Sequence, residues 1–336
     1  MKLFGKDLTR EVAIVAEIGV NHEGDADAAL ELVSLAAEAG ADAVKFQSYT
    51  PARYTAANDA ERLARVGRFA LSEKTHKDLA DEAKARGVHF FSTPLSEDWV
   101  ENLAPLASAI KIASGDLTFE PVVRAAARTG KPVILSTGLG TDDEIDRAVG
   151  WLREEIGAEH LGERVVLLHC VVAYPTPLEE ANLLAIPFLA ERYRVPVGYS
   201  NHVLGLDACF GAVALGACLL EVHFTDQREG RTFRDHQLSL LPGELAELVR
   251  RTPGLRAARG GFGKPRQKSE LAALQAVRKG VVAARDLAAG TVLARDDLMY
   301  ARPATEFAAS ELGTLIGRRL TGDLKRGMLV PRNGIT

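Results

Sequence analysis

The chain has 336 residues, of which 47% are hydrophobic and 26% are charged, a composition that suits a large α/β domain with its own core and a smaller second domain. A net charge of −4 excludes the basic surface of a nucleic-acid-binding protein, and the longest apolar run, residues 208–220, is too short to cross a membrane. Three cysteines without a CxxC pair, and an N-terminal stretch without a signal-peptide pattern, predict a protein of the reducing cytoplasm.

Short apolar stretches alternate with amphipathic segments up to residue 256. Helix-like segments such as residues 25–40 and 72–87 end in glycine, the residue that most often follows a helix C-terminus. Eight strand–helix pairs in succession predict a closed parallel (β/α)8 TIM barrel, with an open doubly wound sheet as the alternative, because periodicity alone does not close a barrel. The predicted strands are residues 13–18, 42–47, 88–93, 109–114, 132–137, 164–170, 195–200 and 219–224.

The composition changes after the predicted barrel. Residues 257–275 are rich in Gly, Arg and Lys, which predicts a linker between a barrel domain of residues 1–256 and a small domain of residues 276–336. Within the small domain, the pattern Asp-Leu-x-x-Gly followed by apolar residues occurs twice, at 286–293 and 323–330. Two such turns predict a compact β-rich unit with internal pseudo-symmetry.

Polar side chains gather at the carboxyl ends of the predicted strands, whereas the strand bodies are apolar. In a parallel barrel these ends meet on one face, where the active site lies. The first strand carries Glu17, the second carries Lys45, and the fourth carries Lys111 between two isoleucines. Lysines combined with hydroxyl groups suit a phosphorylated or carboxylated anion. Other polar residues at or just beyond the strand ends are Gln47, Thr93, Ser114, Ser136, Tyr174, Ser200 and Glu221.

The charged strand residues have structural as well as catalytic interpretations. A buried carboxylate needs a cation or hydrogen bonds, so Glu17 either forms an ion pair with Lys45 or Lys111 or takes part in acid–base catalysis. Lys45 can alternatively lie at the rim with its ammonium group in water. A strand lysine can also be a Schiff-base nucleophile, as in lysine-dependent aldolases.

Two histidines, His202 and His223, follow the seventh and eighth predicted strands. Because these strands are neighbours in the predicted barrel, the two imidazoles can reach one ion. Two imidazoles with open positions suit a divalent metal that is completed by water and substrate oxygens. The alternative is that each histidine is a hydrogen-bonded structural residue.

A series of motifs occurs at barrel spacing: AEIGVNHEGD, DAVKFQ, FFSTP, IKIASGD, PVILSTG, LLHC, AYPTP, VGYSNH and EVHFTD. Together they resemble the sialic acid (N-acetylneuraminate) synthase family. The tail, with DLAAGTVL, YARP and LIGRRL, resembles the antifreeze-like (SAF-type) domain that follows the barrel in this family. The resemblance covers almost the whole chain.

The resemblance implies a transferase that condenses phosphoenolpyruvate with an N-acyl hexosamine, or its phosphate, to give a nine-carbon nonulosonic acid and phosphate. It also implies a divalent metal, Mn²⁺ or Mg²⁺, and a domain-swapped homodimer in which the tail of one subunit closes the barrel of the other. Arg302, in YARP, matches the arginine that the tail presents to the acyl group of the sugar.

Individual residues match the family's site. His202 and His223 match the metal ligands, and Glu17 matches the essential carboxylate. The remaining matches are Lys45, Thr93, Lys111, Ser114, Ser136 and Ser200 for phosphoenolpyruvate, and Gln47, Tyr174 and Asp235 for the sugar.

The sequence also departs from the family pattern. Val171 and Val172 stand where the family has Thr followed by Asn or Ser, so a polar contact is missing or is supplied elsewhere. Residues 49–72 are shorter than the usual loop over the sugar, and Asn58 is a poor substitute for the loop asparagine. The usual Gly-Pro or Gly-Ser before Asp235 is absent. The acceptor therefore stays open between N-acetylmannosamine, a diacetamido trideoxyhexose and a less usual sugar.

Two other functions fit parts of the sequence. A lysine-dependent aldolase would form a borohydride-trappable adduct at a strand lysine and would be insensitive to chelators. A non-catalytic, carbohydrate-binding descendant of a synthase would release no phosphate from phosphoenolpyruvate. Both remain alternatives to the synthase.

Overall fold

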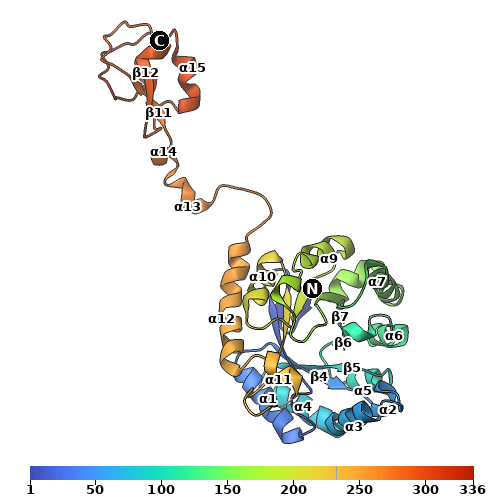
Figure 1. Cartoon of the computed structure of the whole chain (residues 1–336). Coiled ribbons are helices and arrows are strands. Elements are labelled where there is room, and N and C mark those ends of the chain that lie inside the picture. The colour runs from blue at the N-terminus through green and yellow to red at the C-terminus, as the bar shows by residue number, and fades with distance from the viewer. Residues whose placement is uncertain (232) are drawn as a thin grey trace. The chain divides into compact units, whose positions relative to one another are not determined.

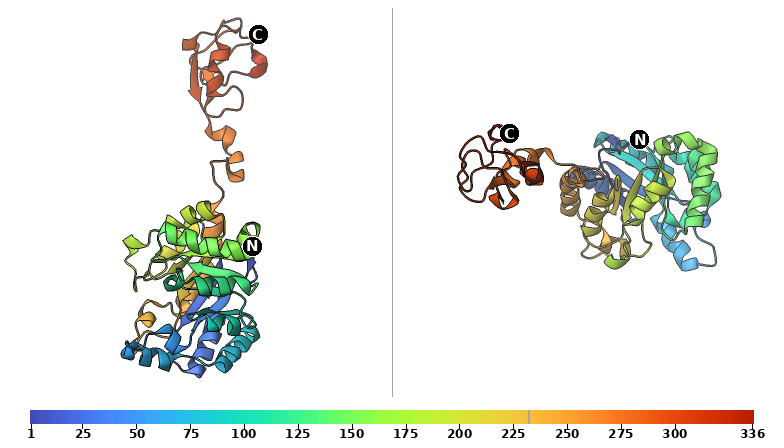
Figure 2. Two further views of the ribbon diagram at one scale, coloured as in Figure 1. Left: turned by 90° about the vertical axis from the view of Figure 1, so that its right-hand side faces the viewer. Right: turned by 90° about the horizontal axis from the view of Figure 1, so that it is seen from above.

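The computed structural model describes residues 1–231 and 233–336, and the chain divides into two units, Met1–Gly260 and Gly261–Thr336. In the first unit, parallel strands close into a barrel in the order β10-β3-β4-β5-β6-β7-β8-β9, with helices around the outside (Figures 1 and 2). The predicted TIM barrel is confirmed, and the open-sheet alternative is wrong. The barrel strands are β3 (Ala13–Gly19), β4 (Ala43–Ser48), β5 (His89–Pro94), β6 (Ile110–Ile112), β7 (Val133–Ser136), β8 (Val165–His169), β9 (Val197–Asn201) and β10 (Leu219–His223).

Helix α1 (Ala26–Glu38) shows why these segments are helical. The side chain of Asp25 accepts hydrogen bonds from two backbone N–H groups of the first turn, and Gly40 follows the helix at φ +88°. The face towards the barrel is apolar at helical spacing. The other helices of this unit are α2 (Pro51–Tyr54), α3 (Ala60–Phe69), α4 (Glu73–Ala85), α5 (Asp98–Leu103), α6 (Glu120–Arg128), α7 (Asp142–Ile156), α8 (Leu161–Arg164), α9 (Ala185–Tyr193), α10 (Asp207–Leu215), α11 (Arg234–Leu238) and α12 (Pro242–Arg259).

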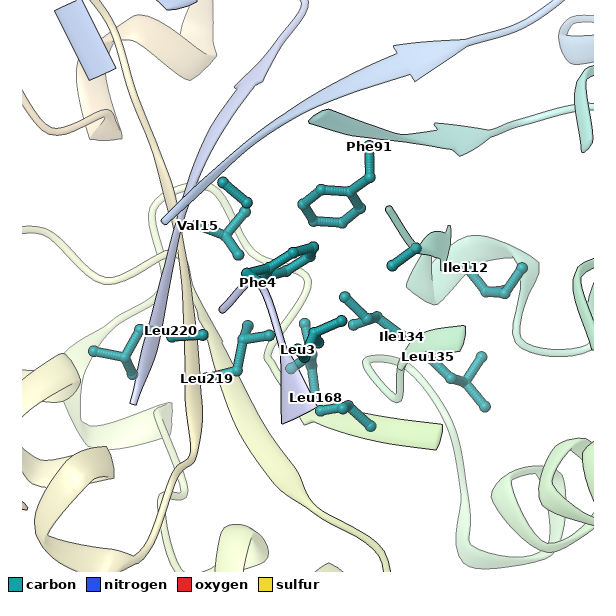
Figure 3. Close-up of a cluster of buried hydrophobic side chains, with 14 of the residues drawn as sticks. Leu3, Phe4, Val15, Phe91, Ile112, Ile134, Leu135, Leu168, Leu219 and Leu220 are labelled. Carbon is teal, nitrogen blue, oxygen red and sulfur yellow. The ribbon is translucent and has the colours of Figure 1, made fainter. Parts of the chain in front are cut away.

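A short hairpin, absent from the sequence-based prediction, closes the amino-terminal end of the barrel. Strand β1 (Lys2–Leu3) pairs antiparallel with β2 (Lys6–Asp7), and both turn residues, Phe4 and Gly5, have positive φ. The Phe4 ring packs against Phe91, with the ring centroids 4.9 Å apart, among aliphatic side chains of the strands (Figure 3). This apolar filling leaves the opposite end of the barrel for polar chemistry.

The strand register aligns polar residues at that opposite end. In the β3–β4 pair, Glu17 lies opposite Lys45, and in the β10–β3 pair, His223 lies opposite Glu17. Glu221 lies opposite Ser200 in the β10–β9 pair. Residues that are far apart in the sequence therefore meet within three residues of the carboxyl ends of their strands.

The second unit has its own apolar core. Strands β11 (Gly280–Ala283) and β12 (Leu298–Ala301) pair antiparallel. The two Asp-Leu-x-x-Gly turns pair with each other, because the backbone N–H of Leu287 and that of Leu324 each donate to the other's carbonyl at 2.8 Å. This mutual pairing matches the predicted pseudo-symmetry. The helices are α13 (Lys268–Leu271), α14 (Leu274–Val277) and α15 (Leu312–Leu315).

Helix α12 continues through Pro253 to Arg259, into the segment predicted as a linker, and α13 lies within that segment as well. The linker and its boundaries stay a prediction. Across the part of the chain that the structure describes, we find no helix with the length and apolar character needed to cross a membrane.

Candidate active site

A cavity of about 860 Å³ lies at the carboxyl ends of the barrel strands. Almost every residue that the sequence analysis assigned to the site lines this cavity. The exception is Arg302, which lies in the second unit, directly after β12, with an exposed side chain. The predicted residues that line the cavity are Glu17, Lys45, Gln47, Thr93, Lys111, Ser114, Ser136, Tyr174, Ser200, His202, His223 and Asp235.

Four charged residues, Glu17, Lys45, Glu221 and Lys111, form what we name the charged floor of the cavity. Lys45 Nζ lies 3.2 Å from Glu17 Oε2 and 3.3 Å from Glu221 Oε1. Lys111 Nζ lies 3.8 Å from the same oxygen of Glu221. Each residue is at most 5% exposed. Buried charges of alternating sign thus form a row in which two ammonium groups balance two carboxylates.

Hydroxyl groups complete the surroundings of the two lysines. Lys111 Nζ donates to Ser136 Oγ at 2.7 Å, and Lys45 Nζ donates to Thr93 Oγ1 at 3.4 Å. Ser200 Oγ donates to Glu221 Oε1 at 2.9 Å. The predicted ion pair of Glu17 with a strand lysine is therefore present. The interpretation of Lys45 as a rim residue with its ammonium in water is wrong, because the residue is buried in the barrel.

Burial moves two protonation equilibria of the floor towards neutral pH. It raises the pKa of Glu17 to about 7, with Lys45 opposing the shift and the charge of Glu221 adding to it. Burial likewise lowers the pKa of Lys111 to about 8, against the attraction of Glu221. Burial also acts to raise the pKa of Glu221, but the two lysines outweigh it and hold that pKa below its ordinary value. Glu17 and Lys111 are thus the floor residues that titrate near neutrality.

The two histidines predicted as metal ligands lie side by side. His202 follows β9 and His223 ends β10, and their ring centroids are 5.4 Å apart. Burial lowers their pKa values to about 4 and about 3, so both imidazoles are neutral at pH 7, the form that binds a metal. His202 Nδ1 lies 2.6 Å from the Val171 carbonyl oxygen, so Nδ1 carries the proton of the neutral imidazole. The lone pair of Nε2 is then available to a metal ion.

His223 Nδ1 is buried and has no hydrogen-bond partner within the described residues. Such an orphaned nitrogen beside a second neutral imidazole fits a divalent ion. Among the described residues, no group of three His, Cys, Asp or Glu side chains forms a closed metal site. Two histidines would therefore leave the other coordination positions to water or substrate oxygens.

An aromatic and polar wall rises beside the histidines. The Tyr174 ring centroid lies 4.2 Å from that of His202, and the Arg234 guanidinium lies 4.8 Å from the Tyr174 centroid. Arg234 Nε also donates to Asp235 Oδ1 at 3.2 Å. On the floor side, Gln47 Nε2 donates to Glu17 Oε1 at 3.3 Å. The wall thus offers hydroxyl, carboxylate and amide groups to a polyol.

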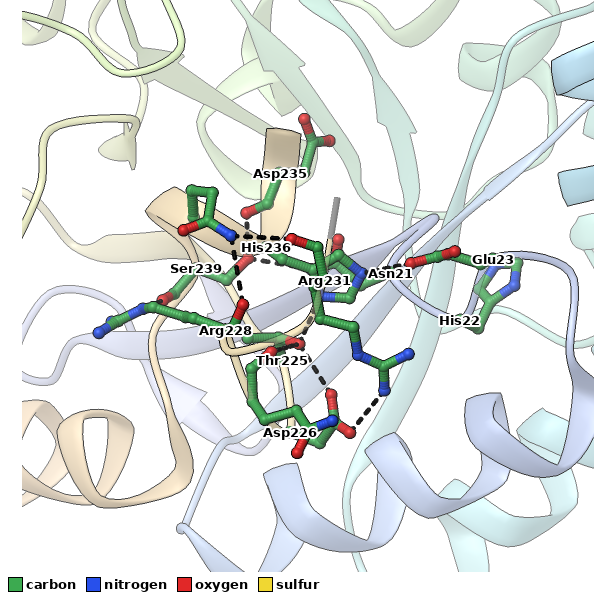
Figure 4. A network of polar contacts seen from close by, with 12 residues as sticks. Asn21, His22, Glu23, Thr225, Asp226, Arg228, Arg231, Asp235, His236 and Ser239 are labelled. Carbon is green, nitrogen blue, oxygen red and sulfur yellow. Dashed lines mark hydrogen bonds and ion pairs between the residues drawn. The ribbon is translucent and has the colours of Figure 1, made fainter. Parts of the chain in front are cut away.

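A hydrogen-bond network holds the segment that carries Asp235 (Figure 4). His236 is fully buried, with Nδ1 at 2.7 Å from Thr225 Oγ1 and Nε2 at 3.1 Å from Glu23 Oε1. Asn21 Nδ2 donates to the Phe224 carbonyl at 2.8 Å. The loop after β3 is therefore tied to the segment after β10, which keeps Asp235 and its neighbours at the cavity.

Several cavity residues received no role from the sequence. Glu221 lies two residues before His223, so strand alternation places both side chains on one face, a signal that the sequence did contain. Arg62 and Arg65 come from α3, which interrupts the connection between β4 and α4. The rule that active-site residues lie at strand ends does not predict residues on such a helix.

The two valines that depart from the family pattern behave differently. Val171 contributes its backbone carbonyl to His202, a contact that any residue type can make. Val172 lines the cavity with an apolar side chain. Asn58 is exposed and is not among the lining residues.

With this geometry established, comparison with known proteins gives the family. The NeuB family matches residues 32–264, and the SAF domain matches residues 278–334. The chain therefore belongs to the NeuB family, carries a C-terminal SAF domain, and is an enzyme. The resemblance found in the sequence is confirmed.

Individual relatives are similar over most of the chain. An N,N'-diacetyllegionaminic acid synthase of Campylobacter jejuni is 36% identical over 335 residues, covering 96% of this chain and 99% of that protein. A synthase of the same name from Legionella pneumophila is 35% identical, covering 94% and 92%. The crystal structure of an N-acetylneuraminic acid (sialic acid) synthetase from Leptospira borgpetersenii superposes with a TM-score of 0.73 at 34% identity, covering 77% of this chain and 89% of that one.

Proposed function

We propose that this enzyme condenses phosphoenolpyruvate with the open-chain aldehyde of an N-acylated amino sugar, releasing a nonulosonic acid and phosphate. The observation that carries the proposal is the balanced, buried charged floor beside two neutral imidazoles in one cavity. The named relatives, synthases of acids of this class, support it.

The floor suits phosphoenolpyruvate, which carries a carboxylate and a phosphate. Lys45 and Lys111 supply ammonium groups, and the hydroxyls of Ser136 and Thr93 are already their hydrogen-bond partners. The side chains of Ser114 and Ser200 extend the hydroxyl lining of the same cavity. Binding in this cradle fixes the enol ester for attack, and such positioning supplies a large part of a rate enhancement.

The reaction forms one carbon–carbon bond and one carbon–oxygen bond to water, and it breaks the carbon–oxygen bond between carbon 2 and the phosphate. Carbon 3 of phosphoenolpyruvate attacks the aldehyde carbon, and cationic character develops at carbon 2. Water adds to carbon 2, and phosphate leaves with its bridging oxygen. One proton of the water ends on the former aldehyde oxygen, which becomes a hydroxyl group. The other ends on phosphate, as carbon 2 becomes a ketone. Glu17, whose pKa burial raises to about 7, can stabilise the cation as a carboxylate and accept a proton from the water.

His202 and His223 would hold the divalent metal, Mn²⁺ or Mg²⁺. When bound, such an ion polarises a carbonyl oxygen as a Lewis acid. The hydrogen bond from His202 Nδ1 to the Val171 carbonyl fixes the imidazole tautomer that the ion needs. Gln47, Tyr174 and Asp235 line the space in which the sugar would lie.

We further propose a domain-swapped homodimer, with Arg302 from the tail of a second subunit contacting the acyl group of the sugar. The side chain of Arg302 is exposed, so its guanidinium group is accessible for such a contact.

A phosphate-release assay tests the function. Phosphoenolpyruvate is supplied with a panel of N-acyl hexosamines, with and without EDTA. We expect phosphate only when a sugar is present, loss with EDTA and recovery with Mn²⁺. Turnover that survives EDTA, with a borohydride-trapped adduct at Lys45 or Lys111, would instead establish the aldolase. Absence of phosphate release with every sugar would favour a carbohydrate-binding protein.

A further inference from the structure

Two arginines on the cavity wall are not used by the chemistry described above. Arg62 and Arg65 lie on α3, one helical turn apart, and both line the cavity. Neither guanidinium forms an ion pair or a hydrogen bond with any of the described residues, although other arginines, such as Arg53, are paired with carboxylates. Unpaired cations at a cavity are available to a ligand.

The charges lining the rest of the cavity are nearly balanced. The charged floor contains two cations and two anions, and Arg234 is paired with Asp235. The remaining acid, Asp116, has its pKa raised by burial to about 6. Arg62 and Arg65 therefore give the cavity its excess of positive charge, and that excess lies on α3 rather than on the strands.

The surroundings of the pair suit an anion that offers two acceptor oxygens to one guanidinium group. The Arg62 guanidinium lies 5.3 Å from the centroid of the Tyr54 ring, which restrains its orientation. On the same helix, Phe69 packs edge-on against Phe233 at 5.4 Å. A guanidinium held against an aromatic ring presents its fork of N–H groups to a phosphate or carboxylate more specifically than a lysine does.

The two arginines also differ from the floor lysines in their solvent exposure. Lys45 and Lys111 are buried, whereas Arg65 is half-buried and Arg62 is exposed. The two anionic groups of phosphoenolpyruvate are accounted for by the floor lysines. A further anionic group bound by the two arginines would therefore belong to the acceptor sugar.

We propose that Arg62 and Arg65 select an acceptor sugar that carries an anionic group, a phosphate or a carboxylate, distant from its aldehyde. The proposal rests on the proposed condensation and assigns the substrate class of the same site.

The test compares three acceptors: N-acetylmannosamine, its 6-phosphate, and the corresponding 6-carboxylate. The variants are Arg62→Gln/Arg65→Gln and, as a matched control, Arg68→Gln, an exposed residue of the same helix that does not line the cavity. We expect kcat/KM of the wild type to favour one of the anionic sugars by about 100-fold, roughly tenfold for each charge-assisted contact. The double variant should lose this preference, and Arg68→Gln should keep it. Whichever of the two anionic sugars the wild type prefers shows whether the arginines recognise a phosphate or a carboxylate.

Two results would overturn the inference. One is a wild type that uses the neutral sugar as well as either anionic sugar. The other is a double variant whose KM for phosphoenolpyruvate rises equally with every acceptor, since the arginines would then serve phosphoenolpyruvate. Absence of turnover with all acceptors would refute the proposed condensation but would not test the selection of an anionic sugar. Calorimetric titration of the three sugars into the full-length enzyme then decides: arginine-dependent preference for an anionic sugar supports the inference, and equal binding refutes it.

Discussion

The charged floor of the cavity differs in origin, burial and charge from the part formed by α3 and α11, which we name the mouth. The floor is built by strand residues such as Lys111 and Glu221, is almost inaccessible to water, and pairs each charge with an opposite one. The mouth is built by the short helices α3 and α11, which contribute Arg62 and Arg234 together with aromatic rings. We therefore expect the floor to serve the substrate common to the family, and the mouth to distinguish one acceptor from another.

Removing a floor cation should have the largest effect. Lys111→Met leaves Glu221 with less compensation and removes an ammonium group from the proposed phosphoenolpyruvate cradle, so we expect kcat/KM to fall by about 10³-fold or more. Steady-state phosphate release measures this, and thermal melting checks that the variant is folded. Lys131→Met, which changes a lysine outside the cavity, is the control. A Lys111→Met enzyme with near-normal turnover would contradict the assignment of the floor.

Glu17→Gln should lower kcat/KM by about 10²- to 10³-fold, as expected for loss of an acid–base group. In the wild type, the carboxylate of Glu17 is lost as the pH falls through about 7, and the charge of Lys111 is lost as the pH rises through about 8. If both charged forms act, kcat/KM follows a bell-shaped curve with its maximum between these values. The variant should lose the acidic limb alone, and persistence of that limb would assign it to another group.

His223→Ala should lower turnover by about 100-fold at limiting Mn²⁺, and part of the loss should be recovered at high Mn²⁺. The physical reason is that the remaining imidazole, His202, binds an ion more weakly alone. The measurement is the Mn²⁺ concentration for half-maximal phosphate release after dialysis against EDTA. An unchanged requirement would show that the histidine pair is structural, the alternative raised by the sequence.

Arg302→Ala should cost about tenfold in kcat/KM, as for one lost charge-assisted contact. Mixing this variant with Lys111→Met tests the domain swap. A barrel with an intact floor can then receive an intact tail from the other subunit, so the mixture should exceed the summed activities of its parts. Simple additivity would mean that each tail acts on its own barrel or on none.

The smallest effect on turnover is expected far from the cavity. Phe4→Ala removes an aromatic ring from the base of the barrel and should destabilise the fold by about 3 kcal/mol or more. Because the ring lies at the end opposite the floor, kcat should stay unchanged below the melting temperature. Denaturant unfolding and steady-state kinetics on the same preparation separate the two effects.

The sequence predicted the floor better than the mouth for a physical reason. Strand register and side-chain alternation are regular, so placing Glu17 and Lys45 at strand ends was enough to bring them together. The hairpin around Phe4 was missed because its two-residue strands are too short for a periodic signal. Arg62 was missed because α3 arises in an irregular connection. The contact of Val171 with His202 was invisible because it uses the backbone, which the sequence does not encode by residue type.

The hairpin at the base of the barrel has a consequence for how the chain reaches its native state. Phe4 emerges early in synthesis, yet the apolar cluster that buries it includes Leu219 and Leu220 of the last strand. The phenyl ring therefore stays incompletely buried until β10 has paired with β9 and β3. Closure of the barrel by β10 and burial of the Phe4 ring at its base then occur together, late in folding. A ribosome-bound chain that lacks β10 would therefore expose both an unpaired strand edge and an aromatic surface to chaperones.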